Sequence, residues 1–221
     1  MKKLLLSAFV ICLAGTSIAQ ESPLWMRHCA LSPDGTTIAF TYKGDIYTVP
    51  STGGRATQIT TNPAFDTEPV WSPDSKQIAF ASDRMGSLDV FVVSSEGGAP
   101  QRLTTHSGSE KPVAYKDNKH ILFTANIAPS AEDAGFPSGQ FQQVYEVAVT
   151  GGRPAMFSSM PMECISINKE GVMLYQDKKG YEDYWRKHQV SPIARDIWTY
   201  TPGKKPVYQK QTTFGGEDRE P

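Results

Sequence analysis

Residues 67–105 read Thr67-Glu-Pro-Val-Trp-Ser-Pro-Asp-Ser75, Gln77-Ile-Ala-Phe-Ala81, Asp89-Val-Phe-Val-Val93 and Gln101-Arg-Leu-Thr104, in that order. Each piece is a short run that ends at turn-forming residues, such as the pair Gly97-Gly98. Runs of this kind, bounded by Pro, Asp, Ser and Gly, are typical of β-strands. The stretch therefore predicts a unit of short antiparallel strands joined by tight turns.

The same unit recurs along the chain at intervals of about forty residues. Its most recognisable part is a turn motif followed by an apolar triplet. This part occurs in four copies, of which the last two are weaker: Ser32-Pro-Asp-Gly35 with Ile38-Ala-Phe40, Ser72-Pro-Asp-Ser75 with Ile78-Ala-Phe80, Lys116-Asp-Asn118 with Ile121-Leu-Phe123, and Lys169-Glu-Gly171 with Val172-Met-Leu174. Repeats of this length with four strands each are the signature of β-propeller blades.

The chemistry of each piece agrees with a propeller. Proline at the second position and glycine at the fourth favour a type I turn in Ser32-Pro-Asp-Gly35. Apolar triplets without alternation suit strands that are covered on both faces, as in stacked blades. Pro100, Pro154 and Pro206 fall at the start of or within the predicted fourth strand, where proline is tolerated only at a sheet edge. The fourth strand is therefore predicted to be the outer edge of each blade.

We predict an all-β propeller of four-stranded antiparallel blades, with four blades and the start of a fifth. The expected blades cover about residues 24–60, 67–105, 111–158 and 163–213, with a stub over 214–221, by the repeat spacing. The stub is inferred because Thr212–Pro221 aligns without a gap on Thr60–Pro69, which opens the second blade. The sequence therefore looks like a truncated piece of a longer protein.

The first 19 residues read as a secretory signal peptide, and the predicted propeller domain covers 20–221. Two lysines precede an apolar stretch from Leu4 to Ala14, and Ser17-Ile-Ala19 offers small residues for cleavage. The alternative is a membrane anchor, but the stretch is shorter than the roughly 20 residues that a spanning helix needs. We expect an exported protein, periplasmic or secreted, without stable membrane insertion after cleavage.

Charge and cysteine content narrow the possible partners. The chain has 22 basic and 23 acidic residues, so no nucleic-acid footprint is expected. Cys29 and Cys164 both fall in the predicted first strand of a blade. Buried thiols are the favoured interpretation and a disulfide between them the alternative. No cysteine and histidine spacing predicts a metal site, and no motif predicts a cofactor.

Two long insertions separate the second and third strands of the third and fourth blades, at Asn126–Gln143 and Lys178–Arg195. Equivalent loops of successive blades leave a propeller on one face, so we expect the insertions to lie side by side, where function usually resides. The first insertion is polar and rich in Pro and Gly. The second is dense in aromatic and charged residues, which suits a peptide or partner contact; its candidates are Tyr181, Tyr184, Trp185, Arg186 and His188. The alternative is that its aromatic residues only pack the loop against its own blade.

Taken together, these pieces resemble the N-terminal part of exported bacterial tricorn-type proteases. The segments that carry the resemblance are Trp25, Ser32-Pro-Asp-Gly-Thr-Thr-Ile-Ala-Phe-Thr-Tyr-Lys-Gly-Asp-Ile-Tyr47, Trp71-Ser-Pro-Asp74, Ala79-Phe-Ala-Ser-Asp-Arg84, Lys179-Gly-Tyr-Glu-Asp-Tyr-Trp-Arg-Lys-His188 and Arg195-Asp-Ile-Trp198. The resemblance implies a multidomain serine peptidase in which propellers, which route peptides, precede a PDZ-like module and a catalytic domain. Its catalytic positions lie far downstream of these segments, so none is assigned here.

The residues themselves agree that catalysis lies elsewhere. The chain contains no Gly-x-Ser-x-Gly or His-Glu-x-x-His motif, and the recurrence of Asp45, Asp89 and Asp196 at strand starts favours a structural role. We therefore expect a non-catalytic propeller that binds or gates peptides or unfolded segments and docks against downstream domains, and that self-associates when isolated. The alternative is a free-standing periplasmic interaction module of the TolB type with no role in proteolysis.

Overall fold

Four antiparallel sheets make up the fold. The computed structural model describes residues 25–127, 142–178 and 193–219. The strands of the first two sheets are β1 (Arg27–Leu31), β2 (Thr37–Tyr42), β3 (Asp45–Pro50), β4 (Thr57–Gln58), β5 (Asp66–Trp71), β6 (Gln77–Ser82), β7 (Asp89–Ser94) and β8 (Gln101–Arg102). Those of the last two are β9 (Glu110–Asp117), β10 (His120–Ala125), β11 (Gln143–Ala148), β12 (Ala155–Ser158), β13 (Met162–Ile167), β14 (Met173–Asp177), β15 (Ile197–Thr201) and β16 (Val207–Lys210).

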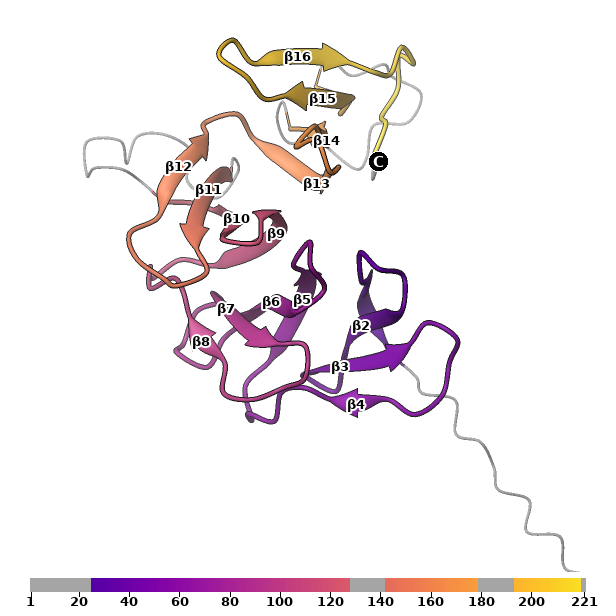
Figure 1. Ribbon diagram of the computed structural model, residues 1–221. Coiled ribbons are helices and arrows are strands. Elements are labelled where there is room, and N and C mark those ends of the chain that lie inside the picture. Colours follow the sequence, from indigo (N-terminus) through magenta and orange to yellow (C-terminus); the bar gives the residue numbers. More distant parts are fainter. Residues whose placement is uncertain (1–24, 128–141, 179–192, 220–221) are drawn as a thin grey trace, which may run out of the picture.

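Each sheet is a meander of four strands in chain order, which is the arrangement of a propeller blade. The four blades follow one another along an arc, and their first strands β1, β5, β9 and β13 contact one another in sequence (Figure 1). The predicted all-β propeller of four-stranded antiparallel blades is confirmed. No helix in the part of the chain that the structure describes is long and apolar enough to cross a membrane.

The turn between the first two strands is built by its own side chains. In the first blade, the Ser32 hydroxyl donates to Oδ1 of Asp34 at 2.6 Å, and it accepts from the amide of Thr37 at 2.9 Å. The backbone amide of Gly35 closes the turn on the Ser32 carbonyl at 2.8 Å, and Gly35 has a φ of 75°. This positive φ explains the glycine, since residues with a Cβ adopt it at some cost.

Apolar clusters between neighbouring blades form the core. Ile78, Ala79 and Phe80 are fully buried, with Ile78 and Phe80 facing the first blade and Ala79 facing the third. The prediction that the triplets are covered on both faces is confirmed for the second and third blades, whose triplets are fully buried, whereas Ile38 in the first and Leu174 in the fourth are only partly buried. The main members of the three clusters are Ile46, Ile59, Trp71 and Phe91 between blades one and two, Val90, Leu103, Phe123 and Tyr145 between blades two and three, and Leu122, Val144, Met173 and Tyr175 between blades three and four.

The outer strands β4, β8, β12 and β16 each end their sheet, which confirms the prediction made from proline. Pro100, Pro154 and Pro206 each stand directly before the fourth strand of their blade. A proline at this position removes no ladder hydrogen bond, because the ladder begins at the next residue.

A bulge with a residue at positive φ interrupts the first strand of blades one, two and four, and it overturns the prediction for the cysteines. The register shifts at His28, Glu68 and Cys164, and each of these residues has a φ between 51° and 55°. A bulge re-aims the side chains around it. Cys29 and Cys164 are consequently exposed rather than buried, and the described part of the chain has no disulfide between them.

Candidate functional site

The end of the blades that carries the two insertions is the natural place to look for a site. Ala125 pairs with Gln143 where the first insertion leaves the third blade, and Gln176 pairs with Ile197 where the second leaves the fourth. We call this the loop end. The candidates Tyr181, Tyr184, Trp185, Arg186 and His188 lie outside the described residues, so their contact role stays a prediction.

A repeated clamp joins the third strand to the chain after the fourth strand at the loop end. The hydroxyl oxygens of Thr60, Thr104 and Thr212 accept from the amides of Ile46, Val90 and Ile197, which follow Asp45, Asp89 and Asp196. The aspartates meet side chains of the fourth strand: Gln58 donates to Asp45 at 3.0 Å, Arg102 lies 2.9 Å from Asp89 and Lys210 lies 2.8 Å from Asp196. The expected structural role of the repeated aspartates is confirmed.

Each clamp is followed by an acidic residue, which in the first two cases opens the next blade: Asp66 begins β5 and Glu110 begins β9. Asp66, Glu110 and Asp218 donate their backbone amides to the carbonyls of Gly44, Leu88 and Arg195, which directly precede the clamp aspartates. An interface between blades therefore brings two carboxylates close together at the loop end. Two carboxylates that share a site need a cation, or else one of them holds its proton.

Between blades one and two, that cation is Arg84. Its Nη2 lies 2.9 Å from Oδ1 and 3.0 Å from Oδ2 of the fully buried Asp66. The guanidinium also lies 4.5 Å from the ring centroid of Phe91 and 5.5 Å from that of Phe80, and these two rings are stacked. The acid and the aromatic pair together form a cradle for a planar cation.

Between blades two and three, the same place has no arginine. Ser82 and Ala125 occupy equivalent positions, opposite Asp66 and Glu110, so the residue that corresponds to Arg84 is Ile127. The Glu110 side chain is 1% exposed, and neither of its carboxyl oxygens accepts a well-aligned hydrogen bond. The cation at this interface, Arg102, pairs with Asp89 instead.

The environment of Glu110 favours its protonated form. Burial raises the pKa of Glu110 to about 7, and the negative charge of Asp89 acts in the same direction. The nearby Thr104 hydroxyl, His106 amide and Arg102 guanidinium lower the pKa of Glu110 but do not offset burial. Glu110 is therefore a carboxyl group that exchanges its proton near neutral pH.

Glu110 lines a cavity of about 810 Å³ between blades two and three. The cavity extends from the loop end to the backbone of Gly151 and Gly152, and its wall includes Leu103, Tyr145 and Met156. Its size and its mixture of apolar walls with a few polar groups are those of a small-ligand pocket. We call it the interblade cavity and take it as the candidate site.

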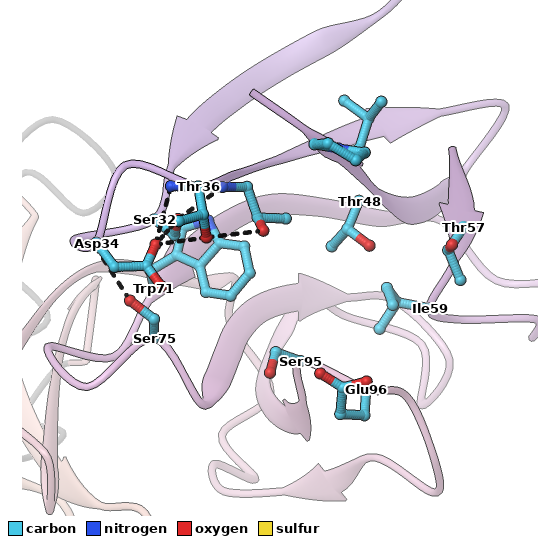
Figure 2. Close-up of a pocket in the computed structure, with 13 residues that line it drawn as sticks. Ser32, Asp34, Thr36, Thr48, Thr57, Ile59, Trp71, Ser75, Ser95 and Glu96 are labelled. Atoms are coloured by element: carbon cyan, nitrogen blue, oxygen red, sulfur yellow. Dashed lines mark hydrogen bonds between the residues drawn. The ribbon is translucent and has the colours of Figure 1, made fainter. Parts of the chain in front are cut away.

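A second cavity, of about 350 Å³, opens at the opposite end, between blades one and two. Figure 2 shows Ser32, Asp34, Thr36 and Ser75 on one side of it and Glu96 on the other. The Ser75 hydroxyl accepts the Asp34 amide at 3.3 Å, and the indole of Trp71 donates to the Ala30 carbonyl at 3.0 Å. These polar groups already join one blade to the next, so we interpret this cavity as structural.

Two of the three histidines that the structure describes have local partners. Nδ1 of His106 accepts the Gly108 amide at 3.0 Å, and Nδ1 of His120 lies 3.0 Å from Asp117. His28 is exposed at the bulge of β1. Within residues 25–127, 142–178 and 193–219, no group of three His, Cys, Asp or Glu side chains is arranged to hold a metal ion.

Sequence reasoning missed Glu110, although the repeat contained the information needed to find it. Thr60 stands six residues before Asp66, Thr104 six before Glu110 and Thr212 six before Asp218. The last of these alignments predicts the fifth blade. The same alignment extended to Glu110 places an acid at the start of the third blade. In that blade the residue equivalent to Arg84 is the apolar Ile127.

Comparison with known proteins places the chain in a family. The model of the tricorn protease N-terminal beta propeller domain matches residues 23–221. Tricorn protease homolog 1 of Streptomyces coelicolor is 39% identical over 77 residues, 35% of this chain and 7% of that protein. The uncharacterized peptidase YuxL of Bacillus subtilis is 32% identical over 108 residues, 43% of this chain and 16% of that protein.

Solved structures share the fold at lower identity. The crystal structure of the tricorn protease superposes with a TM-score of 0.64 and 16% identity over 89% of this chain and 19% of that one. A putative TolB from Agrobacterium tumefaciens superposes with a TM-score of 0.57 and 21% identity. The match covers 86% of this chain and 69% of that one. The chain spans only a small part of the tricorn and YuxL relatives. Because the family model covers nearly all of it, the chain belongs to the tricorn protease N-terminal β-propeller family.

Proposed function

We propose that this propeller binds peptides or unfolded protein segments and passes them to the catalytic domain of a tricorn-type serine peptidase. The observation that carries the proposal is the interblade cavity of about 810 Å³, on a propeller of this family, with the buried Glu110 in its lining. A cavity with apolar walls and a few polar groups suits the side chains of an extended peptide.

Two further features support a role in peptide routing. The strand ends that flank both insertions lie at the loop end, and so does Glu110, so a segment bound at this end would reach the cavity. The fourth strands leave one edge of every sheet unpaired within the described residues, and an extended segment can add to such an edge.

The proposal extends to location and partners. The chain works outside the cytoplasm after removal of residues 1–19, because that segment has the composition of a secretory signal. Its blades dock against further domains of a peptidase, as the small share of the relatives that it spans suggests. The contact residues proposed for this docking are Tyr181, Tyr184, Trp185, Arg186 and His188.

A combined binding and cleavage experiment tests the proposal. The chain from Gln20 onward is mixed with a pool of fluorescent peptides, binding is followed by fluorescence anisotropy, and the pool is analysed by mass spectrometry before and after. We expect saturable binding with every peptide intact. If no peptide binds while a folded periplasmic protein does, the chain is a TolB-type interaction module and the proposal is wrong.

Cleavage of the pool would contradict the proposal in another way. A contaminating peptidase is excluded by repeating the assay after a further purification step and after treatment with a serine-reactive inhibitor. Cleavage that persists at constant specific activity would mean that the propeller itself carries an active site. The residues at the loop end would then be the first to be substituted.

A further inference from the structure

We propose that the interblade cavity is a binding site for a guanidinium or ammonium group, such as the side chain of an arginine or lysine in a bound peptide. The inference deepens the proposed function and rests on it, because it names the class of peptide that the propeller selects. It is carried by a comparison between two interfaces of the same molecule.

The interface between blades one and two shows what such a site looks like when it is filled. Asp66 opens the second blade, the stacked rings of Phe80 and Phe91 lie behind it, and the Arg84 guanidinium contacts all three groups. The cation there comes from the chain itself, two residues beyond β6.

The interface between blades two and three repeats the acid and the aromatic pair of that cradle, but its arginine, Arg102, pairs with Asp89 and not with Glu110. Glu110 opens the third blade at the position of Asp66. Phe123 and Tyr145 take the places of Phe80 and Phe91, with centroids 5.7 Å apart and planes at 26°, against 5.9 Å and 24° in the second blade. The position of Arg84 is taken by Ile127, which packs against the apolar cluster.

Two arginines line the cavity, Arg102 and Arg153, but neither forms an ion pair with Glu110 in the part of the chain that the structure describes. Residues 128–141, which follow Ile127, contain no lysine, arginine or histidine. Arg102 is nearby, but its Nη2 lies 2.9 Å from Oδ2 of Asp89, a fully buried carboxylate that needs a counter-ion of its own. Asp89 and Glu110 are therefore two buried carboxyl groups with one arginine between them.

A positive group from a ligand would complete the site. It would lie against Glu110 and the ring of Tyr145, both of which line the cavity. There it would balance the charge of Glu110, as Arg84 balances the charge of Asp66 in the neighbouring interface. A guanidinium fits this arrangement best, because it is planar, weakly hydrated and able to stack on aromatic rings. Access to the Glu110 oxygens requires the loop around His106 to move, since these oxygens have no contact with bulk water.

Binding should also displace a proton. Glu110 has a raised pKa and is partly protonated at neutral pH, so a cation that favours its ionised form releases that proton. The other charged or titratable side chains near Glu110 or in the cavity wall are Asp89 on β7, Arg102 on β8, His106 between β8 and β9, and Arg153 between β11 and β12.

Titration calorimetry with matched peptides tests the inference. Two peptides are compared that differ only in one arginine or its neutral isostere citrulline, with the chain from Gln20 onward at pH 7 in two buffers of different ionisation enthalpy. We expect the arginine peptide to bind at least about tenfold more tightly, as is typical of a desolvated charge pair. Its binding should release a fraction of a proton.

Variants decide whether Glu110 is responsible. Glu110→Gln keeps the shape of the side chain and should abolish both the preference for arginine and the proton release, whereas His106→Gln should preserve them. Glu96→Gln, the same change at the other cavity, should leave both unchanged. Ile127→Arg should block the site by restoring the internal cation. Thermal unfolding of each variant shows that it is folded.

The outcomes separate the two proposals. If both peptides bind wild type equally, or if Glu110→Gln binds like wild type, the cation site is wrong while peptide binding stands. If neither peptide binds a folded wild-type chain, both proposals are wrong.

Discussion

At the scale of single residues, the buried carboxyl groups at the loop end differ in whether a cation neutralises them. Asp66 has the Arg84 guanidinium at hydrogen-bonding distance. Glu110, its equivalent in the next blade, has no cation at that distance in the described part of the chain. We therefore expect that removing the Arg84 cation destabilises the chain, whereas removing the charge of Glu110 stabilises it.

The first prediction concerns Arg84. Arg84→Met leaves Asp66 as an uncompensated charge in a buried position, and we expect this to lower the free energy of unfolding by about 3–5 kcal/mol. Urea denaturation of the chain from Gln20 onward measures the change. Adding Asp66→Asn should recover a large part of the loss, because the buried charge is then removed. A double variant as unstable as Arg84→Met would show that the loss comes from packing instead.

The second prediction concerns Glu110 and pH. Its pKa is about 7 in the folded state against an ordinary 4.5, so the folded state holds this proton more tightly than the unfolded chain. The contribution of Glu110 to stability is complete below the lower value and is lost as the pH rises through about 7. Glu110→Gln should therefore stabilise the chain at pH 8, by no more than about 3 kcal/mol, and change it little at pH 4.5.

Urea unfolding of wild type and Glu110→Gln at several pH values measures this difference. Glu96→Gln is the matched control, because Glu96 is exposed and its substitution should shift stability equally at every pH. A Glu110→Gln variant that is less stable than wild type at pH 8 would mean that the ionised carboxylate has a partner in the folded protein.

At the scale of strands and turns, much of the blade could be predicted from sequence. The turn residues, the doubly covered triplets and the edge prolines each obey local rules, so the blade pattern follows from a single copy. The bulge at His28, Glu68 and Cys164 could not be predicted, because these residues share no side-chain property. The burial of Cys29 and Cys164 was predicted wrongly for that reason.

The clamp between the third and fourth strands gives the third prediction. In Thr60→Val the buried amide of Ile46 loses its acceptor, while the shape of the side chain is kept. We expect a loss of about 1–3 kcal/mol, the cost of an unsatisfied buried donor. The same change at the exposed Thr61 should cost almost nothing. Equal stability of Thr60→Val and wild type would show that a water molecule or a shift of β4 replaces the hydroxyl.

At the scale of the whole molecule, the first blade presents an uncovered face within the described residues. Ile38, Phe40, Tyr47 and Val49 correspond to Ile78, Phe80, Phe91 and Val93, which pack against the preceding blade. Ile38, Tyr47 and Val49 are partly exposed. A propeller protects such faces by closure or by contact with another subunit.

The fourth prediction is that the isolated chain from Gln20 onward self-associates through this face. Sedimentation velocity should show a larger species that grows with protein concentration, and Val49→Glu should shift the distribution toward the monomer without unfolding it. A wild-type chain that stays monomeric at high concentration and unfolds cooperatively would contradict the prediction.

The site illustrates what the whole molecule adds to the sequence. The candidates at 181–188 came from the composition of one loop, and the structure does not describe them. The interblade cavity instead depends on residues from two blades, with Glu110 from β9 and its neighbour Asp89 from β7. The strand pairing makes Ile127 the equivalent of Arg84. Only this comparison of two blades shows that Glu110 has no arginine at the position where Asp66 has one.

Photo-crosslinking tests most directly the claim that the loop end of this propeller receives peptides. An arginine-containing peptide with a benzophenone group is bound to the chain from Gln20 onward, irradiated and mapped by mass spectrometry. The account predicts crosslinks on the walls of the interblade cavity, at Leu103, Tyr145 and Met156, and their loss in Glu110→Gln. Crosslinks confined to the cavity of Figure 2, or none in a folded chain, would contradict it.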